Sequence, residues 1–454
     1  MKVSINKTSL LTYTALVLLS AVATVAVIAL LMNINQRKEE GHSTYVELVP
    51  LDESTVDPAI WGKNFPRQYD GYRRTVDTER TRFGGSEAFS RLEQDPRLVR
   101  IFAGYGFSLD FNEERGHAYT LSDQKETKRV TELDMPGACA HCHASIIPLY
   151  REVGDGDVMR GFEEVCGWPI EDVHARVEHP VACIDCHDPE TMALRVTRPG
   201  FLNGIRELKK LEGIENYNPN TMATRQEMRT FVCGQCHVEY YFKGEGKVLT
   251  YPWSKGLNID SIEEYYDETG FFDWKHGETN AQVIKAQHPE FELWNQGIHA
   301  KSGVACADCH MPYMREGAVK ISDHHIRSPL LNAERACGSC HPRGGAEMVA
   351  RAEEIQAKTV ELMNRSEDAL IALYDEIIQA QEQGVPQAAL EEARYLQRRA
   401  QFRVDFINAE NSHGFHAPQE AARILGTAID YARQGQVLLA RYNTHQAAET
   451  AEEQ

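Results

Sequence analysis

The chain has too few basic side chains to balance its acidic ones. It contains 48 Lys and Arg against 67 Asp and Glu, which gives a net charge of −19 at pH 7. A surface with this charge repels the phosphates of nucleic acid, so the composition excludes a nucleic-acid partner and argues against a generally polyanion-binding surface. An anionic substrate would therefore need a local region of positive charge.

Charged side chains are absent altogether from residues 9–36. Most of this stretch is apolar and long enough to cross a bilayer. Lys2 and Lys7 precede it, and they should stay in the cytoplasm, which places the rest of the chain on the periplasmic side of the membrane. We predict that residues 1–36 form an uncleaved anchor, because the apolar run exceeds the usual length in a signal peptide. The alternative is a cleaved signal peptide, with Ala21-Val22-Ala23 as cleavage site and a soluble periplasmic product.

Sustained helical periodicity is missing between residues 136 and 342, where Gly and Pro are frequent. This texture is typical of a chain that wraps cofactors rather than one that builds regular layers. The stretch 37–60 is polar and predicts a linker between the anchor and the body of the protein.

Residues 343–454 are predicted to form a C-terminal helical region. Apolar side chains recur at helical spacing from Val349 to Ile377, a second helical run covers about 387–411, and Pro418 opens a third. Amphipathic helices of this length need a partner surface. Packing on a cofactor core and a dimer interface both satisfy that need.

The cysteines carry the strongest signal in the chain. Ten of its 11 Cys fall into five copies of Cys-x-x-Cys-His. The two thiols of a motif can bond the two vinyl groups of one porphyrin, and the adjacent His can ligate the iron from the proximal side. A disulfide or zinc framework would not need a His at the end of every motif. The motifs consist of Cys139, Cys142 and His143; Cys183, Cys186 and His187; Cys233, Cys236 and His237; Cys306, Cys309 and His310; and Cys337, Cys340 and His341.

The motifs predict five covalently bound haem c groups, packed close together within residues 139–341. The haems would then make up much of the core. The expected fold class is mainly α, a multihaem cytochrome with a loop-rich haem-binding core and long C-terminal helices. The remaining thiol, Cys166, is expected to be buried and inert.

Seven short segments carry a second signal. They are Arg115–Ala118, Thr127–Arg129, Cys233–Tyr241, Lys285–Glu290, Gly297–His299, Ser322–His324 and Gly414–Glu420. Together with the five haem motifs they resemble the cytochrome c nitrite reductases, over a span from about Trp61 to Arg433. The resemblance implies six-electron reduction of nitrite to ammonium at a haem with an open iron position, with four bis-His haems relaying electrons. It makes residues 61–342 a pentahaem catalytic domain.

The same resemblance implies that Arg129, Tyr240 and His288 face the open iron position. These side chains suit the task physically. Arg129 offers a fixed positive charge and a fork of donors to an anion. His288 can donate a hydrogen bond and a proton near neutral pH, and Tyr240 adds a phenolic donor that can also supply an electron.

The resemblance also implies the distal ligands of the other four haems. These are His324 for the second haem, His117 for the third, His416 for the fourth and His299 for the fifth. His325 and His413 are near neighbours that could substitute. His141 is interpreted as a bystander within the first motif, and the other histidines as ordinary core or surface residues, namely His42, His174, His179, His276 and His445.

A calcium site beside the reacting haem is implied as well. Its ligands would be the Glu239 and Gln287 side chains with the Tyr240 and Lys285 carbonyl oxygens. An all-oxygen set suits Ca²⁺, and its charge would help to attract nitrite. The alternative is a simple ion pair between Glu239 and Lys285.

One position departs from the family pattern. Most of the family has Lys at the end of the first motif, whereas this chain has His143. We predict that His143 ligates the first haem iron on one side and that the other side is open, because that side would be lined by Arg129, Tyr240 and His288.

The remaining predictions concern partners and competing functions. The helices of residues 343–454 predict a homodimer, and the anchor and the family together imply a membrane-bound quinol-oxidising multihaem cytochrome as electron donor. Two alternatives stay open at this level. One is an electron-transfer cytochrome without a catalytic site, and the other is a reductase of hydroxylamine, sulfite or nitric oxide.

Overall fold

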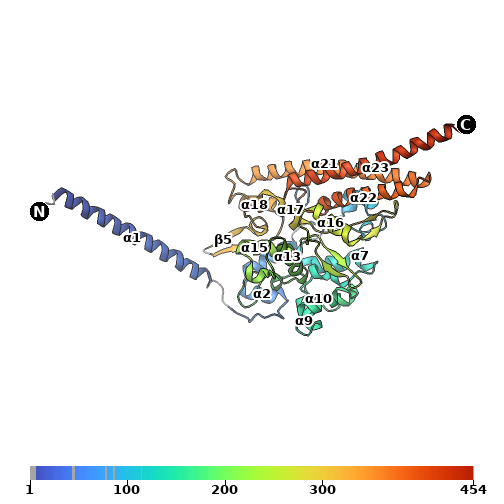
Figure 1. Cartoon of the computed structure of the whole chain (residues 1–454). Helices are drawn as coiled ribbons and strands as arrows, with labels where there is room; N and C mark the ends of the chain where they lie inside the picture. The colour runs from blue at the N-terminus through green and yellow to red at the C-terminus, as the bar shows by residue number, and fades with distance from the viewer. Residues whose placement is uncertain are drawn as a thin grey trace.

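The computed structural model describes residues 7–42, 47–76, 79–84, 87–113, 115–317 and 319–452. Helix dominates throughout these ranges, which confirms the predicted mainly α class. The N-terminal helix α1 spans Lys7–His42 and projects from the body of the protein (Figure 1). Within it, Leu10–Arg37 contains an 18-residue window with a mean hydropathy of 2.8 and is the one helical stretch in the described ranges that is long and apolar enough to cross a membrane.

Short helices joined by loops build the region that carries the five motifs. The α-helices are α2 (Pro58–Asn64), α3 (Pro66–Arg73), α4 (Arg91–Gln94), α5 (Arg97–Ile101), α6 (Thr120–Glu126), α7 (Lys128–Thr131), α8 (Ala140–His143), α9 (Ile147–Val153), α10 (Val158–Cys166), α11 (Ile170–His174), α12 (Cys183–Cys186), α13 (Pro199–Leu211), α14 (Pro219–Met222), α15 (Arg225–Gly234), α16 (Ile259–Thr269), α17 (Glu290–Gln296), α18 (Ile298–Lys301), α19 (Cys306–His310) and α20 (Ala333–Ala336). The 3₁₀ helices are η1 (Arg74–Val76), η2 (Gly106–Ser108), η3 (His117–Tyr119), η4 (Gly137–Cys139) and η5 (Pro329–Asn332).

Each of the five motifs includes or adjoins a helical segment. A helical turn brings residues three apart to the same face, so both thiols of a motif point the same way. In two motifs an internal aspartate secures that turn. The Asp185 carboxylate accepts a hydrogen bond from the Ala182 N–H at 2.8 Å, and the Asp308 carboxylate accepts one from the Ala305 N–H at 2.8 Å.

The strands form short antiparallel hairpins. In the described ranges these are β1 (Tyr241–Lys243) with β2 (Val248–Thr250), β3 (Trp274–Lys275) with β4 (Gln282–Val283), and β5 (Tyr313–Glu316) with β6 (Val319–Ser322). Tyr241 pairs with Thr250 in the first, Trp274 with Val283 in the second and Tyr313 with Ser322 in the third. None of these two-stranded units forms a layer of its own, so helices and loops set the architecture.

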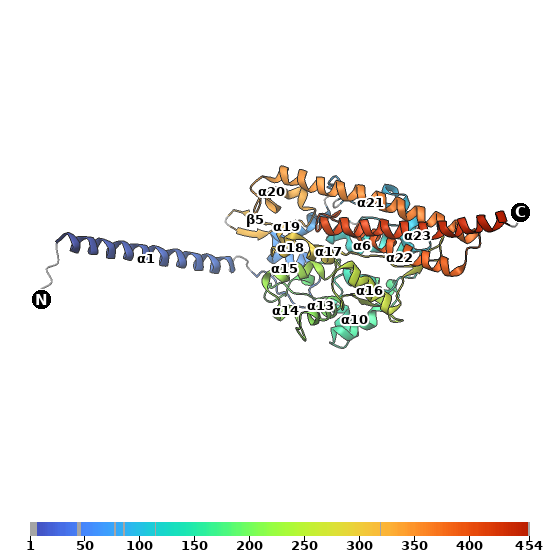
Figure 2. The same cartoon turned by 45° about the horizontal axis from the view of Figure 1, so that its top comes forward.

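Three long helices cover one side of the haem-binding region. They are α21 (Gly345–Glu382), α22 (Gln387–Ala409) and α23 (Pro418–Glu452), and they run along one another (Figures 1 and 2). The predicted long C-terminal helices are thus confirmed. Leu370, Leu373 and other apolar side chains of α21 are fully buried in a core that they share with α5 and β3–β4.

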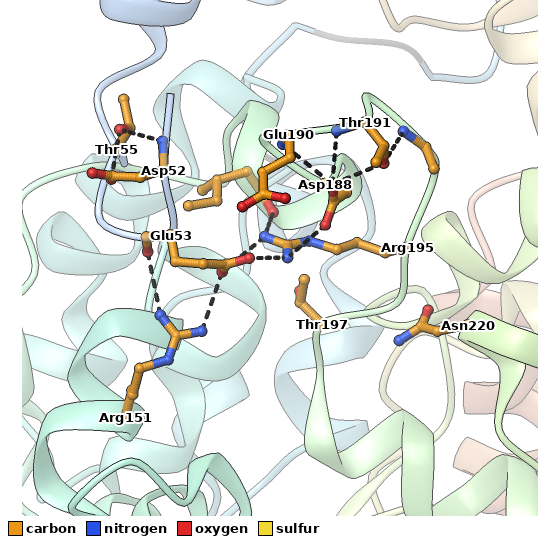
Figure 3. Close-up of polar contacts among 12 residues, drawn as sticks. Asp52, Glu53, Thr55, Arg151, Asp188, Glu190, Thr191, Arg195, Thr197 and Asn220 are labelled. Atoms are coloured by element: carbon orange, nitrogen blue, oxygen red, sulfur yellow. Dashed lines mark hydrogen bonds and ion pairs between the residues drawn. The ribbon is translucent and has the colours of Figure 1, made fainter. Parts of the chain in front are cut away.

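Residues 47–57 attach the chain that follows α1 to the haem-binding region. The Glu53 carboxylate lies between two guanidinium groups, with Oε2 3.1 Å from Arg151 Nη2 and 3.2 Å from Arg195 Nη2 (Figure 3). Arg195 also lies 3.6 Å from Asp188, the residue after the second motif. These ion pairs are partly exposed, so each adds little stability, but together they fix where this segment runs.

Candidate functional site

One cavity connects all five motifs. Its volume is about 1590 Å³, whereas a pocket for a single drug-sized ligand measures about 300–1,000 Å³. A cavity of this size with thiols and imidazoles along its wall suits several porphyrins rather than one small ligand. Every cysteine and histidine of the five motifs lines it, and so do His117, His299, His324, His416, Arg129, Tyr240 and His288.

Four pairs of histidine rings face each other across this cavity. An imidazole nitrogen lies about 2 Å from a metal that it ligates, so two rings on opposite sides of one iron have centroids about 6 Å apart. Each pair joins one motif histidine to one of the four histidines predicted as distal ligands. The centroid separations are 6.3 Å for His187–His324, 6.4 Å for His117–His237, 6.4 Å for His310–His416 and 6.3 Å for His299–His341.

The Nδ1 atoms of several of these rings are held by acceptors, which leaves Nε2 to face the cavity. Backbone carbonyl groups serve His143, His187 and His310, at 3.2 Å from Thr120 O, 3.0 Å from Met192 O and 3.1 Å from Arg327 O. An acceptor at Nδ1 sets the tautomer and orientation of a ligating histidine and raises its basicity. The arrangement therefore fits imidazoles prepared to bind a metal.

Two rings meet carboxylates instead, which the sequence had not predicted. His416 Nδ1 lies 2.5 Å from Glu410 Oε1, and His237 Nδ1 lies 3.9 Å from Glu290 Oε1. Glu290 belongs to the segment Lys285–Glu290, but no sequence pattern linked it to a motif 53 residues earlier. Glu410 precedes its histidine by six residues in a non-helical turn, and such turns leave no periodic signal.

The three residues predicted to be catalytic gather around the first motif. Arg129 lies on α7, and its charge acts on the Cys139 thiol and on the Tyr240 hydroxyl. His288 is close enough to His143 for their charges to interact. The Arg129 Nε atom is buried and has no hydrogen-bond partner within the described part of the chain, so the guanidinium group retains donor capacity at the cavity.

Burial sets the charge of the other two groups. It raises the pKa of the Tyr240 hydroxyl well above its ordinary value, so that Tyr240 is a neutral donor. It lowers the pKa of His288 to about 4, against a smaller opposite effect of Glu290. A neutral imidazole still donates one hydrogen bond, so Arg129 supplies the fixed positive charge of this trio.

Contacts join three of the four predicted calcium ligands, namely Glu239, Lys285 and Gln287. The Glu239 carboxyl group is fully buried, and it accepts hydrogen bonds from the Tyr266 hydroxyl at 2.9 Å and from the Gln287 N–H at 2.7 Å. The Gln287 amide nitrogen is 3.3 Å from the Lys285 carbonyl oxygen, and turning that amide would place two oxygens side by side. The residue after Glu239 is Tyr240. This donor set fits a hard cation.

Buried acids in this region lack enough positive charge to stay ionised. Burial raises the pKa of Glu239 well above its ordinary value and that of Asp273 to about 7, and a bound cation would stabilise the ionised carboxylates. The alternative ion pair between Glu239 and Lys285 is not formed, because Lys285 Nζ pairs with Asp405 at 2.9 Å. No group of three or more His, Cys, Asp or Glu side chains with metal-ligand geometry occurs in the described ranges.

Three of the histidines predicted to be bystanders have their own partners. His141 is buried, with Nδ1 3.1 Å from the Tyr150 hydroxyl. His174 lies 3.0 Å from Gln124 Oε1, and His276 lies 2.8 Å from the Arg100 carbonyl oxygen. Neither His174, His276 nor His141 lines the cavity. The side chains of His42 and His445 lie outside the described residues. Cys166 is buried, and burial raises its pKa to about 12, as an inert thiol requires.

Comparison with known proteins agrees with this geometry. The model of the cytochrome c552 family matches residues 57–454. A cytochrome c-552 of Porphyromonas gingivalis is 37% identical over 422 residues, which cover 90% of this chain and 81% of that protein. A cytochrome c-552 of Parabacteroides distasonis is 39% identical over 386 residues, which cover 83% and 75%. The structure of the cytochrome c nitrite reductase of Desulfovibrio desulfuricans, whose catalytic subunit has two calcium sites, is similar with a TM-score of 0.77 and 28% identity, over 87% of this chain and 88% of that one.

Proposed function

This chain belongs to the cytochrome c552 family, and from that premise we propose that it is an enzyme that reduces nitrite to ammonium with six electrons. The observation that carries the proposal is the gathering of Arg129, Tyr240 and His288 at the first motif, inside the cavity that the other four motifs share. A pure electron carrier would not need a fixed positive charge at that place, whereas an anionic substrate does.

The chain's own residues account for binding and proton delivery. When bound, the haem of the first motif supplies an iron position for the nitrogen of nitrite and the electrons that reduce it. Arg129 attracts and orients the anion, because a guanidinium group offers charge and a planar fork of donors. His288 and Tyr240 donate hydrogen bonds to its oxygen atoms and lie where protons must be delivered.

The other four motifs suit an electron relay. The second cysteine of the first motif, Cys142, contacts Cys236 of the third, and Cys233 of the third contacts Cys306 of the fourth. Each of the four histidine pairs would close both axial positions of its iron and leave it no substrate site. Covalent haems attached to touching motifs are close enough to pass electrons toward the first motif.

We propose the following organisation for the whole chain. Residues 1–36 anchor it on the periplasmic side of the cytoplasmic membrane, residues 37–60 connect the anchor, residues 61–342 bind the haems, and residues 343–454 form the helical region. A membrane-bound quinol-oxidising multihaem cytochrome is the proposed electron donor, because an anchor formed by the apolar helix α1 would keep the haem domain at the membrane.

A direct assay tests the activity. Reduced methyl viologen should drive nitrite consumption with formation of one ammonium per nitrite, and a Cys139→Ser variant, which loses one thioether of the first haem, should lose most of this turnover. Hydroxylamine, sulfite and nitric oxide are tested in parallel. Viologen oxidation by one of these substrates but not by nitrite would contradict the proposed substrate, and turnover with none would favour the electron carrier.

Calcium removal provides a second prediction. We propose that Glu239, Gln287 and the carbonyl groups of Tyr240 and Lys285 hold Ca²⁺. Chelation should then lower nitrite turnover, and added Ca²⁺ should restore it. A Glu239→Ala variant should be impaired and should not recover with Ca²⁺, because a ligand is missing. Full activity of a chelated preparation shown by elemental analysis to lack calcium would contradict the site.

A homodimer is the third prediction. Apolar side chains on the long helices remain exposed in the single chain, among them Val437 at 53% on α23 and Tyr395 at 45% on α22. A second copy would cover such a surface. We expect the protein mass from sedimentation in detergent to correspond to two chains at micromolar concentration, and a single-chain mass would contradict this interface.

A further inference from the structure

Phe107 contacts the side chain that is proposed to bind the substrate anion. The centre of the Arg129 guanidinium group lies 4.0 Å from the centroid of the Phe107 ring, which is within cation–π distance. The neighbouring Gly106 also lies against the aliphatic stem of the arginine, since a Cβ atom there would lie 3.4 Å from Arg129 Cγ. Both Phe107 and Arg129 line the haem cavity.

The backbone around this contact is also tied together. Asp110 Oδ2 accepts hydrogen bonds from the Thr127 hydroxyl at 2.9 Å and from the Lys128 N–H at 2.8 Å, at the start of α7. The turn that carries Phe107 therefore holds the helix that carries Arg129. The contact between ring and guanidinium group follows from this docking and not from a chance approach of two flexible side chains.

The ring itself is fixed by an aromatic cluster, which consists of Phe102, Tyr105, Phe107 and Phe111. Its centroid lies 5.1 Å from that of Phe111, at an angle of 84°, and 5.8 Å from that of Tyr105, at an angle of 18°. Edge-to-face and stacked pairs at such distances are favourable. Phe107 thus has little freedom to move away from the arginine.

A second cation lies against the same ring. Lys285 Nζ is 4.8 Å from the Phe107 centroid and forms a buried ion pair with Asp405. Lys285 is also the residue whose carbonyl group belongs to the proposed calcium site. The neutral Phe107 ring contacts both Arg129 and Lys285, so the two positive side chains can lie near one another without a carboxylate beside Arg129. Such a carboxylate would compete with an anionic substrate for the guanidinium group.

We propose that Phe107 is a positioning residue for Arg129, and that its ring holds the guanidinium group at the cavity so that its donors are directed to the anionic substrate. The inference rests on the proposed function. A carboxylate in place of the ring would also hold the arginine, but it would neutralise the charge that attracts nitrite. An aromatic ring holds the cation and leaves its charge available.

The test uses the full chain with its haems and measures nitrite binding from the change in the haem absorption spectrum. Phe107→Leu should weaken nitrite binding about tenfold, which corresponds to about 1.4 kcal/mol. Phe107→Tyr keeps an aromatic face and should bind nitrite like the unaltered protein. Steady-state assays should show that KM rises more than kcat falls in Phe107→Leu.

Phe111→Leu is the matched control, because Phe111 belongs to the same cluster and touches Lys285 but has no contact with Arg129 among the cation–π pairs of the described residues. Haem content per chain is measured for every variant. If Phe107→Leu and Phe111→Leu bind nitrite equally well, the ring only packs and the inference is wrong. If Arg129→Ala binds nitrite normally, the proposed site itself fails, so the two failures are distinguishable.

Discussion

Nitrite turnover is expected to fall about 100- to 1000-fold when any one of Arg129, Tyr240 and His288 loses its donor, in the variants Arg129→Ala, Tyr240→Phe and His288→Ala. The reason is that these groups lie beside the first motif, where negative charge and protons must be handled during reduction. Donors fixed in a buried site stabilise such charge far better than water does.

Haem content separates this effect from misfolding. Pyridine haemochrome and intact mass should give five haems per chain for each variant, since none of the three residues belongs to a motif. Lys128→Ala is the matched control, because Lys128 lies on the same helix as Arg129 but is exposed. Near-normal turnover in all three variants would contradict the proposed site, and a fall in the control as well would mean that the net charge of α7 is what matters.

Four low-spin haems and one high-spin haem are expected from electron paramagnetic resonance of the oxidised protein. The four histidine pairs would give strong-field ligands on both sides of four irons, whereas Arg129, Tyr240 and His288 would line the open face of the first haem. Removing the distal ligand with His324→Ala should produce a second high-spin haem without loss of covalent attachment. Nitrite or cyanide should shift the original high-spin signal.

The angle between the two imidazole rings of a pair identifies which low-spin signal should be lost when one of them is removed. The His187 and His324 planes are 28° apart, whereas the His299 and His341 planes are 85° apart. Near-parallel imidazoles interact unequally with the two iron d orbitals that they overlap and give a rhombic spectrum, while perpendicular rings leave those orbitals nearly degenerate. His324→Ala should therefore remove a rhombic component. Five low-spin haems that respond to neither anion would contradict the enzyme as a whole and favour an electron carrier.

The haem attachment sites and the long C-terminal helices could be predicted from the sequence, because both depend on residues that are close together in the chain. Each haem attachment site needs only five consecutive residues, so the motifs alone predict how many haems are bound. Helical periodicity with Pro386 and Pro418 at the boundaries predicts helices close to the observed α22 and α23, because such signals repeat over many turns. The short helices of residues 58–336 have too few turns for periodicity to show, and their positions depend on the cofactors and on packing.

Contacts between distant segments were decided by the tertiary structure. A distal histidine such as His117 approaches His237 across 120 residues, and only the resemblance to a family suggested which histidines would meet. Lys285 pairs with Asp405 and not with Glu239, although Glu239 is nearer in the sequence. The reason is that the fold buries Lys285 and Asp405 against each other. The position of Phe107 against Arg129 has no sequence signature, since an aromatic ring in a loop looks the same whether it holds an arginine or only fills space. Covalent attachment is a property of neighbouring residues, whereas the geometry that selects a substrate comes from side chains that only folding brings together.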